Sequence, residues 1–467
     1  MIGALSVFQI TGGLNMNISQ IVALVIFVGM FALIVWDHFE KHHVTLVCAL
    51  LTIIFVFGLC MNDTSAIKES LNITSIFQPG FWYANGAAEE ESAGINWSTI
   101  IFLWGMMVMV EGLSGAGFFN WLCMKLARAV EYRPMSLFIS FMFLSAVLAM
   151  FIDSITVILF LSSVTIELGK LLKFDPVPMI LSEIFCANLG GSATMCGDPP
   201  NIIIGTSLHY TFTDFLSNTG EIAAISLIAV VFYYYLIFHK QLSEISISEE
   251  DIAGMPSPES FVTDKKSFMV NCGIFIIAVL LLVSHAKTGL TVAFIGALTA
   301  ALTLMAGRDK SIRYLKNVDY NTLLFFIGLF VVVSGLELTG VLELLAAFIG
   351  KVSGGNLYVV VVIIICLSAL CSALVDNIPF AATMIPVIKT LSENMSLPLP
   401  VLVWTLAIGT DIGGSATPIG ASANVVGISV AKKNGHEIGW GKYCKTAVPA
   451  TITVIVISTL IIFLKYC

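Results

Sequence analysis

Residues 190–201 have the sequence GGSATMCGDPPN, and residues 413–424 have the sequence GGSATPIGASAN. Each stretch is polar and rich in glycine, yet each lies inside a long apolar segment. A polar, glycine-rich interruption of this kind is expected where a transmembrane helix is broken at the binding site of a transporter. Because the interruption occurs twice, the sequence predicts two related halves that each supply one broken helix.

The two stretches belong to a longer internal repeat. The offset that separates them also aligns Asn96–Asn201 with Asp319–Asn424 without a gap, and it places Asp153 on Asp376. Glycines outside the two stretches fall in register as well, namely Gly105 on Gly328, Gly112 on Gly335 and Gly117 on Gly340. Chance similarity between apolar segments does not align glycines, so the repeat indicates a structural duplication.

The composition is that of an integral membrane protein. Of the 467 residues, 58% are hydrophobic and 11% are charged, whereas about a quarter of the residues of a soluble protein are charged. The first basic residue is Lys41, so the N-terminus lacks the basic region of a signal peptide, and Ile21–Trp36 is predicted to be a permanent first span. The main partner of this chain is therefore the lipid bilayer.

Several other classes of protein are disfavoured by the sequence. The net charge is −8 and no basic patch is present, so we expect no nucleic-acid partner. The ten cysteines are scattered without a Cys-x-x-Cys pair, which favours packing over a metal site. No zinc-protease motif His-Glu-x-x-His occurs, and we predict no enzyme activity, no cofactor and no metal beyond a possible Na⁺ as coupling ion.

Each half is predicted to contain five crossings and one re-entrant hairpin, giving an all-α membrane fold with two inverted-topology repeats and broken helices at the midplane. The expected domains are residues 1–238 and 267–467, joined by the linker 239–266. The first half has crossings at about Ile21–Trp36, Val44–Cys60, Ser98–Leu113, Val177–Leu208 and Ile222–Phe238. The second half has crossings at about Phe268–Ser284, Thr288–Met305, Asn321–Gly340, Pro400–Ala431 and Ala447–Leu464.

The hairpins are expected between Arg133 and Lys170 and between Asn356 and Glu393, with Asp153 and Asp376 at their tips. Basic residues in loops predict the orientation, because cytoplasmic loops are enriched in Lys and Arg. The basic loops are those containing Lys41, Lys125 to Arg133, Lys240 to Lys266 and Arg308 to Lys316. We therefore expect a cytoplasmic linker, both termini outside, and location in a plasma membrane, with a bacterial inner membrane as the best match.

The site is predicted where the hairpin tips meet the two breaks. Glycine and proline keep the helices interrupted, and freed backbone groups can bind ions of either sign. A simple helix kink is the alternative, but it would have to recur with the same residues in both halves. The predicted binding side chains are Ser154, Thr156, Ser192, Thr194, Asn201, Asn377, Ser415, Thr417, Ser422 and Asn424, and the backbone positions are Gly190, Gly191, Gly197, Gly413, Gly414 and Gly420.

Four carboxylates complete the predicted site, because ionisable groups at membrane depth are costly and usually functional. Asp153 and Asp376 could bind an ion or equally cap a half-helix. Asp198 aligns with Ala421, and Asp411 aligns with Asn188, so symmetry does not require these two carboxylates. Asp198 and Asp411 are therefore the preferred candidates for coupling to an ion or a proton. Two glutamates in apolar spans, Glu111 and Glu337, are interpreted as structural.

At these residues the sequence resembles the ArsB/NhaD permeases of the ion transporter superfamily, which include arsenite permeases, Na⁺/H⁺ antiporters and pink-eyed dilution proteins. The similarity lies in Asp376-Asn377-Ile378-Pro379-Phe380, in residues 419–426 (IGASANVV) and in Gly197-Asp198-Pro199-Pro200-Asn201. The resemblance implies an elevator-type transporter that is usually a homodimer, with distant relatives among the divalent-anion/sodium symporters. It implies a moving domain from about 134–208 and 356–432, with the remaining helices forming the scaffold.

The leading functional prediction is a secondary active transporter coupled to Na⁺ or H⁺, either a Na⁺/H⁺ exchanger or an exporter of an oxyanion such as arsenite. The alternative is a Na⁺-coupled symporter of a citrate-like carboxylate. Carboxylates at the hairpin tips disfavour an anionic substrate beside them, unless they are protonated or screened by Na⁺. A channel would need a continuous polar pore, and an intramembrane enzyme would need a catalytic pair. The substrate, whether a small ion or an anion, stays open.

Overall fold

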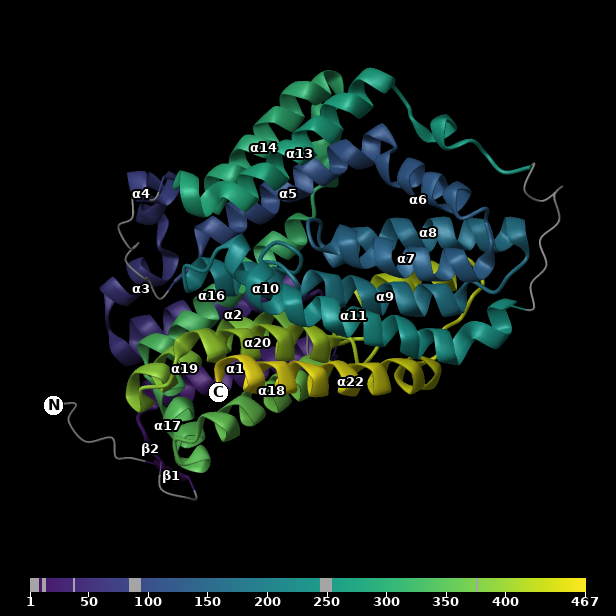
Figure 1. Ribbon diagram of the computed structural model, residues 1–467. Helices are drawn as coiled ribbons and strands as arrows, with labels where there is room; N and C mark the ends of the chain where they lie inside the picture. The colour runs from purple at the N-terminus through teal and green to yellow at the C-terminus, as the bar shows by residue number, and fades with distance from the viewer. Residues whose placement is uncertain (1–7, 11–13, 37, 84–93, 244–253, 375–376) are drawn as a thin grey trace.

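The computed structural model describes residues 8–10, 14–36, 38–83, 94–243, 254–374 and 377–467. Helices make up nearly all of this part of the chain (Figure 1), and it contains one short antiparallel ribbon of β1 (Phe8–Ile10) and β2 (Leu14–Met16). Within the described residues, ten helices are long and apolar enough to cross a membrane. The predicted all-helical membrane fold is confirmed.

The first half contains long apolar helices, three short helices in the predicted exterior loop, two hairpin arms and one broken helix. Its elements are α1 (Ile18–Trp36), α2 (Lys41–Leu51), the π-helical η1 (Thr52–Met61), α3 (Thr64–Leu71), η2 (Ile73–Phe77), α4 (Pro79–Trp82), α5 (Trp97–Ala116), α6 (Phe118–Ala129), α7 (Pro134–Ala149), α8 (Ser154–Leu172), α9 (Val177–Gly191), α10 (Pro199–Ser207) and α11 (Phe212–Ser243).

The second half repeats this order, with two short helices in place of the three that precede α5. Its elements are η3 (Pro258–Phe261), α13 (Lys265–Thr288), α14 (Val292–Gly307), η4 (Arg308–Lys310), α15 (Ser311–Asn317), α16 (Tyr320–Leu338), α17 (Val341–Ser353), α18 (Leu357–Leu374), α19 (Asn377–Met395), α20 (Leu399–Gly414), α21 (Ser422–Lys433) and α22 (Trp440–Tyr466).

The predicted hairpins are the pairs α7–α8 and α18–α19. Of these four described helices, only α8 and α18 are long and apolar enough to span a bilayer. Their tips nevertheless stop at the level of the broken helices, because Ser154 at the start of α8 contacts Asp198 in the first break, and Asn377 at the start of α19 contacts the same carboxylate. The hairpins approach this level from opposite ends of the molecule (Figure 1), as the inverted repeat requires.

Equivalent hydrogen bonds in the two halves demonstrate the duplication. The Thr194 hydroxyl donates to the carbonyl of Met150, and its equivalent Thr417 donates to the carbonyl of Ala373, with 2.5 Å between the oxygens in each pair. Asn96 caps α5 through the amide of Thr99, and Asp319 caps α16 through the amide of Thr322. The sequence repeat is thus a repeat of structure.

The two halves exchange helices, in the sense that a helix of each half has its main packing partner in the other half. α5 of the first half packs on α14 of the second, and α16 of the second half packs on α2 of the first. Small residues allow both approaches: a Cβ added to Gly105 would lie 2.1 Å from the carbonyl oxygen of Gly296, and one added to Gly328 would lie 2.6 Å from the carbonyl carbon of Thr45. Close backbone packing at small residues is typical of helices within a bilayer.

The hairpins and the broken helices form a second group. α9 and α10 pack on α20, α8 packs on α21, and α11 and α22 pack on each other and along α7, α9, α18 and α20. The helices α11 and α22 were predicted to belong to the scaffold. In the structure they pack on each other and on hairpin arms and broken helices. By these contacts the molecule contains one layer of exchanged helices, formed by α2, α5, α14 and α16, and one block of hairpins, broken helices and these two flanking helices.

Residues from loops and helix ends line two hollows at opposite ends of the helices. At one end, Arg128 and Tyr132 line a small hollow with Met255 and Pro258 from the second part of the linker. At the other end, residues of α3 and η2 lie with His209 and Lys389 around a larger cavity. This grouping agrees with the loop pairing on which the predicted orientation depends.

Candidate functional site

Both predicted breaks are present. The first helix stops at Gly191 and resumes at Pro199, and the second stops at Gly414 and resumes at Ser422. The residues before the resumed helices have the same extended backbone, with φ −140° and ψ 143° at Asp198 and φ −139° and ψ 145° at Ala421. Pro199 occupies the first helical position of α10, where its missing N–H costs no hydrogen bond.

The glycines of the two breaks act differently from the prediction. Backbone freedom was the expected reason for glycine, yet none of the six predicted glycines has a positive φ. Close packing is the reason instead. A Cβ on Gly190 would lie 2.1 Å from the Ala146 carbonyl oxygen, and one on Gly413 would lie 2.3 Å from the Ala369 Cα. The backbone of each broken helix therefore packs directly against the backbone of the first arm of its own hairpin.

Asn201 and Asn424 hold their own breaks together. The Asn201 side-chain amide nitrogen donates to the carbonyls of Gly191 at 3.3 Å and Thr194 at 3.2 Å. The Asn424 nitrogen donates to Gly414 at 2.8 Å and Thr417 at 2.7 Å. These carbonyls lie where the chain leaves the helix and loses its regular donors, so the two amides replace the missing helical hydrogen bonds.

Asn188 joins the two repeats. This residue lies on α9 with no exposed surface, and its amide nitrogen donates to Asn424 Oδ1 at 2.9 Å and to the Ser415 hydroxyl at 3.1 Å. The two breaks are thus adjacent in space, as predicted, and are connected by direct hydrogen bonds through a buried amide.

Asp198 lies between the two hairpin tips. The Ser154 hydroxyl donates to its Oδ1 at 3.0 Å, and the Asn377 amide nitrogen donates to its Oδ2 at 3.0 Å. The carboxylate is only 4% exposed. One carboxylate from the first break therefore connects the tips of hairpins that belong to opposite repeats.

Asp411, on α20, is fully buried beside Asp198 and the side chain of Asn201. Neither of its carboxylate oxygens has a hydrogen-bond partner among the described residues, and the same holds for the Oδ1 atoms of Asn188 and Asn201. Buried polar atoms in proteins are almost always paired. The unpaired oxygens of Asp411, beside Asp198 and the side chain of Asn201, therefore provide an environment suited to a positive charge.

The remaining predicted residues support the loops. Asp153 caps α8, accepting from the amide of Thr156 at 3.0 Å and from its hydroxyl at 2.6 Å, so the capping alternative describes its observed contacts. Ser192 donates to the Leu189 carbonyl, and Ser422 begins α21. Asp376, at the second tip, lies outside the described residues.

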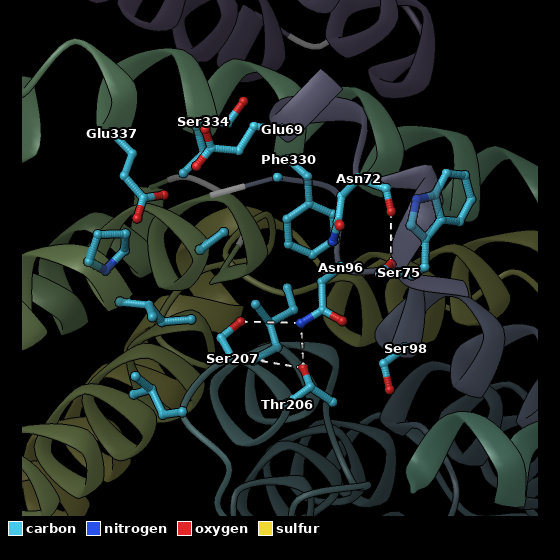
Figure 2. Close-up of a pocket in the computed structure, with 18 of the residues that line it drawn as sticks. Glu69, Asn72, Ser75, Asn96, Ser98, Thr206, Ser207, Phe330, Ser334 and Glu337 are labelled. Carbon is cyan, nitrogen blue, oxygen red and sulfur yellow. Dashed lines mark hydrogen bonds between the residues drawn. The ribbon is translucent and has the colours of Figure 1, made fainter. Parts of the chain in front are cut away.

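A cavity of about 800 Å³ lies at the end of the molecule that carries α3, and the last turn of α10 lines it. Figure 2 shows its wall, where Asn96 at the start of α5 donates to Thr206 at 2.9 Å and to Ser207 at 3.3 Å in the last turn of α10. Glu69 on α3 and Glu337 on α16 also line this cavity. The nine-residue helix α10 thus connects the cavity with the first break.

Sequence analysis missed several buried polar groups. Glu183 is 1% exposed on α9 and accepts a hydrogen bond from Thr165 at 2.6 Å; its position inside an apolar span was the available signal. Asn188 was noted only as the partner of Asp411 in the alignment. Glu40, His42 and His43 bring ligand atoms within 4.8 Å of one another at the start of α2, but two of the three are exposed, unlike a closed structural metal site.

Comparisons with known proteins agree with this architecture. A family model described as "Citrate transporter" matches residues 10–409. An uncharacterized transporter of Mycobacterium tuberculosis is 30% identical over 455 residues, which cover 96% of this chain and 99% of that protein. The P protein of Homo sapiens is 28% identical over 443 residues, which cover 77% of this chain and 52% of that protein.

Two solved transporter structures share the fold. The YdaH transporter of Alcanivorax borkumensis superposes with a TM-score of 0.58 at 13% identity, covering 96% of this chain and 98% of that one. MtrF of Neisseria gonorrhoeae, described as illuminating a class of antimetabolite efflux pumps, gives a TM-score of 0.56 at 12% identity and covers 97% and 96%. At such identities the likeness concerns the fold alone.

Proposed function

Since this chain belongs to the citrate transporter family, we propose that it is a secondary active transporter coupled to Na⁺ or H⁺ by alternating access. Its class as a membrane transporter follows from the family and from the ten apolar helices in the described part of the chain. The coupling ion, the substrate and the direction of transport are the parts that we propose.

The observation that carries the proposal is the position of Asp198. This carboxylate belongs to a broken helix and accepts hydrogen bonds from the tips of two hairpins of opposite repeats. A substrate or ion bound there would contact both halves of the transporter at once. Such a position is what alternating access requires, because the same site must become reachable from either side as the halves rearrange.

The charge of the site favours a cation as at least one of the transported species. Asp198 and Asp411 lie close together in the protein interior, and two adjacent carboxylates at membrane depth are costly unless a positive charge accompanies them. Na⁺/H⁺ exchange fits this environment directly. Efflux of an oxyanion such as arsenite would need the cation to bind first and screen the carboxylates.

A cation-coupled symporter of a citrate-like carboxylate is the second candidate, and the family description favours it. The donors Ser154 and Asn377 at the tips could hold a substrate carboxylate once Asp198 is protonated or screened. In this mechanism the cation binds before the anion, so substrate affinity should rise with the concentration of the coupling cation.

We further propose an elevator movement in which the block of α7 to α11 and α18 to α22 moves against the exchanged helices of the other layer. The packing of α11 and α22 on the hairpins and broken helices supports including both in the moving block. The proposed oligomer is a homodimer, and the proposed orientation places the linker in the cytoplasm and both termini outside.

Flux measurements in proteoliposomes test the proposal. We expect uptake of radiolabelled Na⁺ or citrate that responds to an imposed pH or Na⁺ gradient and is accelerated by the same species on the opposite side. Asp198→Asn should abolish this flux without loss of monodisperse protein. The matched control is Asp309→Asn, which neutralises an exposed carboxylate in η4 and should transport as the unmodified protein does.

A channel gives a different result in the same assay. Ion flux that is not accelerated by ions on the opposite side would contradict the transporter mechanism. Undiminished gradient-driven transport by Asp198→Asn would contradict the assigned site.

A further inference from the structure

Asn188 and Asp411 occupy equivalent positions in the two repeats, yet one is an amide and the other a carboxyl group. Asn188 uses its amide nitrogen to reach the other repeat, where it donates to Asn424 Oδ1 at 2.9 Å and to the Ser415 hydroxyl at 3.1 Å. Structural symmetry predicts the same two contacts around Asp411, with Asn201 in place of Asn424 and Ser192 in place of Ser415.

Neither equivalent contact brings a donor within hydrogen-bonding geometry of the Asp411 oxygens among the described residues. The two N–H groups of Asn201 are committed to the carbonyls of Gly191 and Thr194, and the Ser192 hydroxyl donates to the carbonyl of Leu189 at 2.8 Å. The Asn201 side chain lies beside Asp411, and both its Oδ1 and the oxygens of an ionised Asp411 carboxyl group are acceptors. Both groups are fully buried, and their oxygens have no hydrogen-bond partner among the described residues.

The orientation of the Asn201 amide follows from its own contacts. Reversing the amide would place its oxygen against two backbone carbonyls, which are acceptors. Asn424 makes the same pair of contacts with its nitrogen and accepts from Asn188 with its oxygen. The oxygen of Asn201 thus lacks the donor that the oxygen of Asn424 possesses.

The charge of Asp198 increases the need for a positive charge at Asp411, and other titratable groups on the surrounding elements make their contacts elsewhere. Asp198, between α9 and α10, adds a second carboxylate. Glu183 on α9 is directed to Thr165, Tyr443 on α22 donates to the Ser415 carbonyl, and Lys389 on α19 lines the cavity at the end of the molecule. None of these contacts supplies a donor to Asp411, and an unpaired buried carboxylate is strongly destabilising.

We propose that Asp411 binds the coupling proton and, in this conformation, donates it in a hydrogen bond to Oδ1 of Asn201. This inference rests on the proposed function and identifies the coupling ion and its residue. The proton makes Asp411 a donor as Asn188 is, so each repeat contributes one equivalent hydrogen bond across the pseudo-symmetry. When the proton is released to water, the Asp411 carboxylate and Asn201 Oδ1 are both acceptors and lie beside Asp198. This arrangement is then disfavoured, and another conformation of the protein is favoured.

Infrared difference spectroscopy tests the proton directly. Spectra of the reconstituted protein at neutral pH are recorded for the unmodified chain and for Asp411→Asn. We expect the difference to contain the C=O stretching band of a protonated carboxyl group. Asparagine at position 411 can donate as Asn188 does, so we also expect the variant to remain folded and its melting temperature not to fall. Absence of the band from the difference spectrum overturns the proposal.

Two further variants keep the test decisive. Asn188→Asp combined with Asp411→Asn moves the carboxyl group to the equivalent position, where it faces Asn424, and should restore a carboxyl band. Asn201→Ala removes the acceptor and should shift the band of the unmodified chain to higher frequency. A band that is insensitive to Asn201→Ala contradicts the assigned hydrogen bond.

Sodium provides the opposing outcome. If NaCl, compared with choline chloride, raises the melting temperature of the unmodified protein but not of Asp411→Asn, Na⁺ occupies this position and the proton assignment is wrong. The spectra are independent of flux. Loss of the band with gradient-driven transport intact refutes only the proton site, whereas a normal band without transport refutes only the proposed function.

Discussion

One buried asparagine side chain in each half stabilises the ordered conformation of its helix break. Asn201 and Asn424 each bind two carbonyls at the point where their helix stops, and both are fully buried. They were predicted as ligands of the transported species, but their donors are occupied by the protein's own backbone. These contacts fix the shape of each break. The Oδ1 of Asn424 accepts from Asn188, whereas the Oδ1 of Asn201 has no hydrogen-bond partner among the described residues.

Asn201→Ala and Asn424→Ala should each lower both stability and transport. Each change leaves two buried carbonyls without a donor, at about 1–3 kcal/mol for each unsatisfied group. We expect a lower melting temperature in detergent and a sharp loss of flux in proteoliposomes. Asn394→Ala, at an exposed amide near the end of α19, is the control and should change neither quantity appreciably. Flux at the unmodified rate in both site variants would contradict this role.

At the scale of elements, the distance between a hairpin and its broken helix is set by glycine. Gly190 and Gly413 lie in contact with the backbone of α7 and α18, so each hairpin arm and its broken helix behave as one packed unit. This arrangement keeps the tips at the level of the breaks while the unit as a whole can change position.

Gly190→Ala and Gly413→Ala should separate these packed elements. Because the added methyl group would lie 2.1 Å and 2.3 Å from backbone atoms, the helices must move, at a cost of about 1–3 kcal/mol or more. Gly273→Ala on α13 meets nothing within 4 Å and should be neutral or slightly stabilising. Thermal unfolding of the three purified variants compares them, and an unchanged melting temperature for Gly190→Ala would contradict the close packing.

The sequence was sufficient to predict elements that depend on repetition and polarity. Both breaks and both hairpins were predicted because glycines, Asn201 and Asn424 recur in register within apolar segments. The reason for the glycines was wrong, because close packing between helices is a tertiary property that local sequence does not reveal. Asn188 and Glu183 were missed as site residues, since a single polar residue in an apolar helix does not indicate its partner in another helix.

At the scale of the whole molecule, the cavity in Figure 2 is lined both by the exchanged helices α5 and α16 and by α10 and α19 of the block. The hydroxyls of Thr99 on α5 and Thr206 on α10 are 2.8 Å apart, and Asn96 donates to the same turn of α10. These contacts join an exchanged helix to the proposed moving block. An elevator movement would have to break them, whereas a local rearrangement at the hairpin tips would leave them intact.

A disulfide across this boundary should therefore stop transport. We expect Thr99→Cys with Thr206→Cys to lose flux on oxidation and to recover it on reduction. Ser70→Cys with Ser334→Cys joins α3 to α16 within one layer, where the hydroxyls are 2.5 Å apart, and its oxidation should leave flux unchanged. Both pairs are tested in a background without the native cysteines. Full transport by the oxidised first pair would exclude relative movement at this contact.

The exchange of helices between the halves also affects how the protein is made. α2 finds its main partner in α16 and α5 finds its partner in α14, so the early helices leave the ribosome long before the segments that they pack against. Until the second half is synthesised, the glycine-lined faces of the first half are exposed in the bilayer, where they can associate wrongly or be recognised by membrane quality control. Complete assembly of either half thus depends on synthesis of the other.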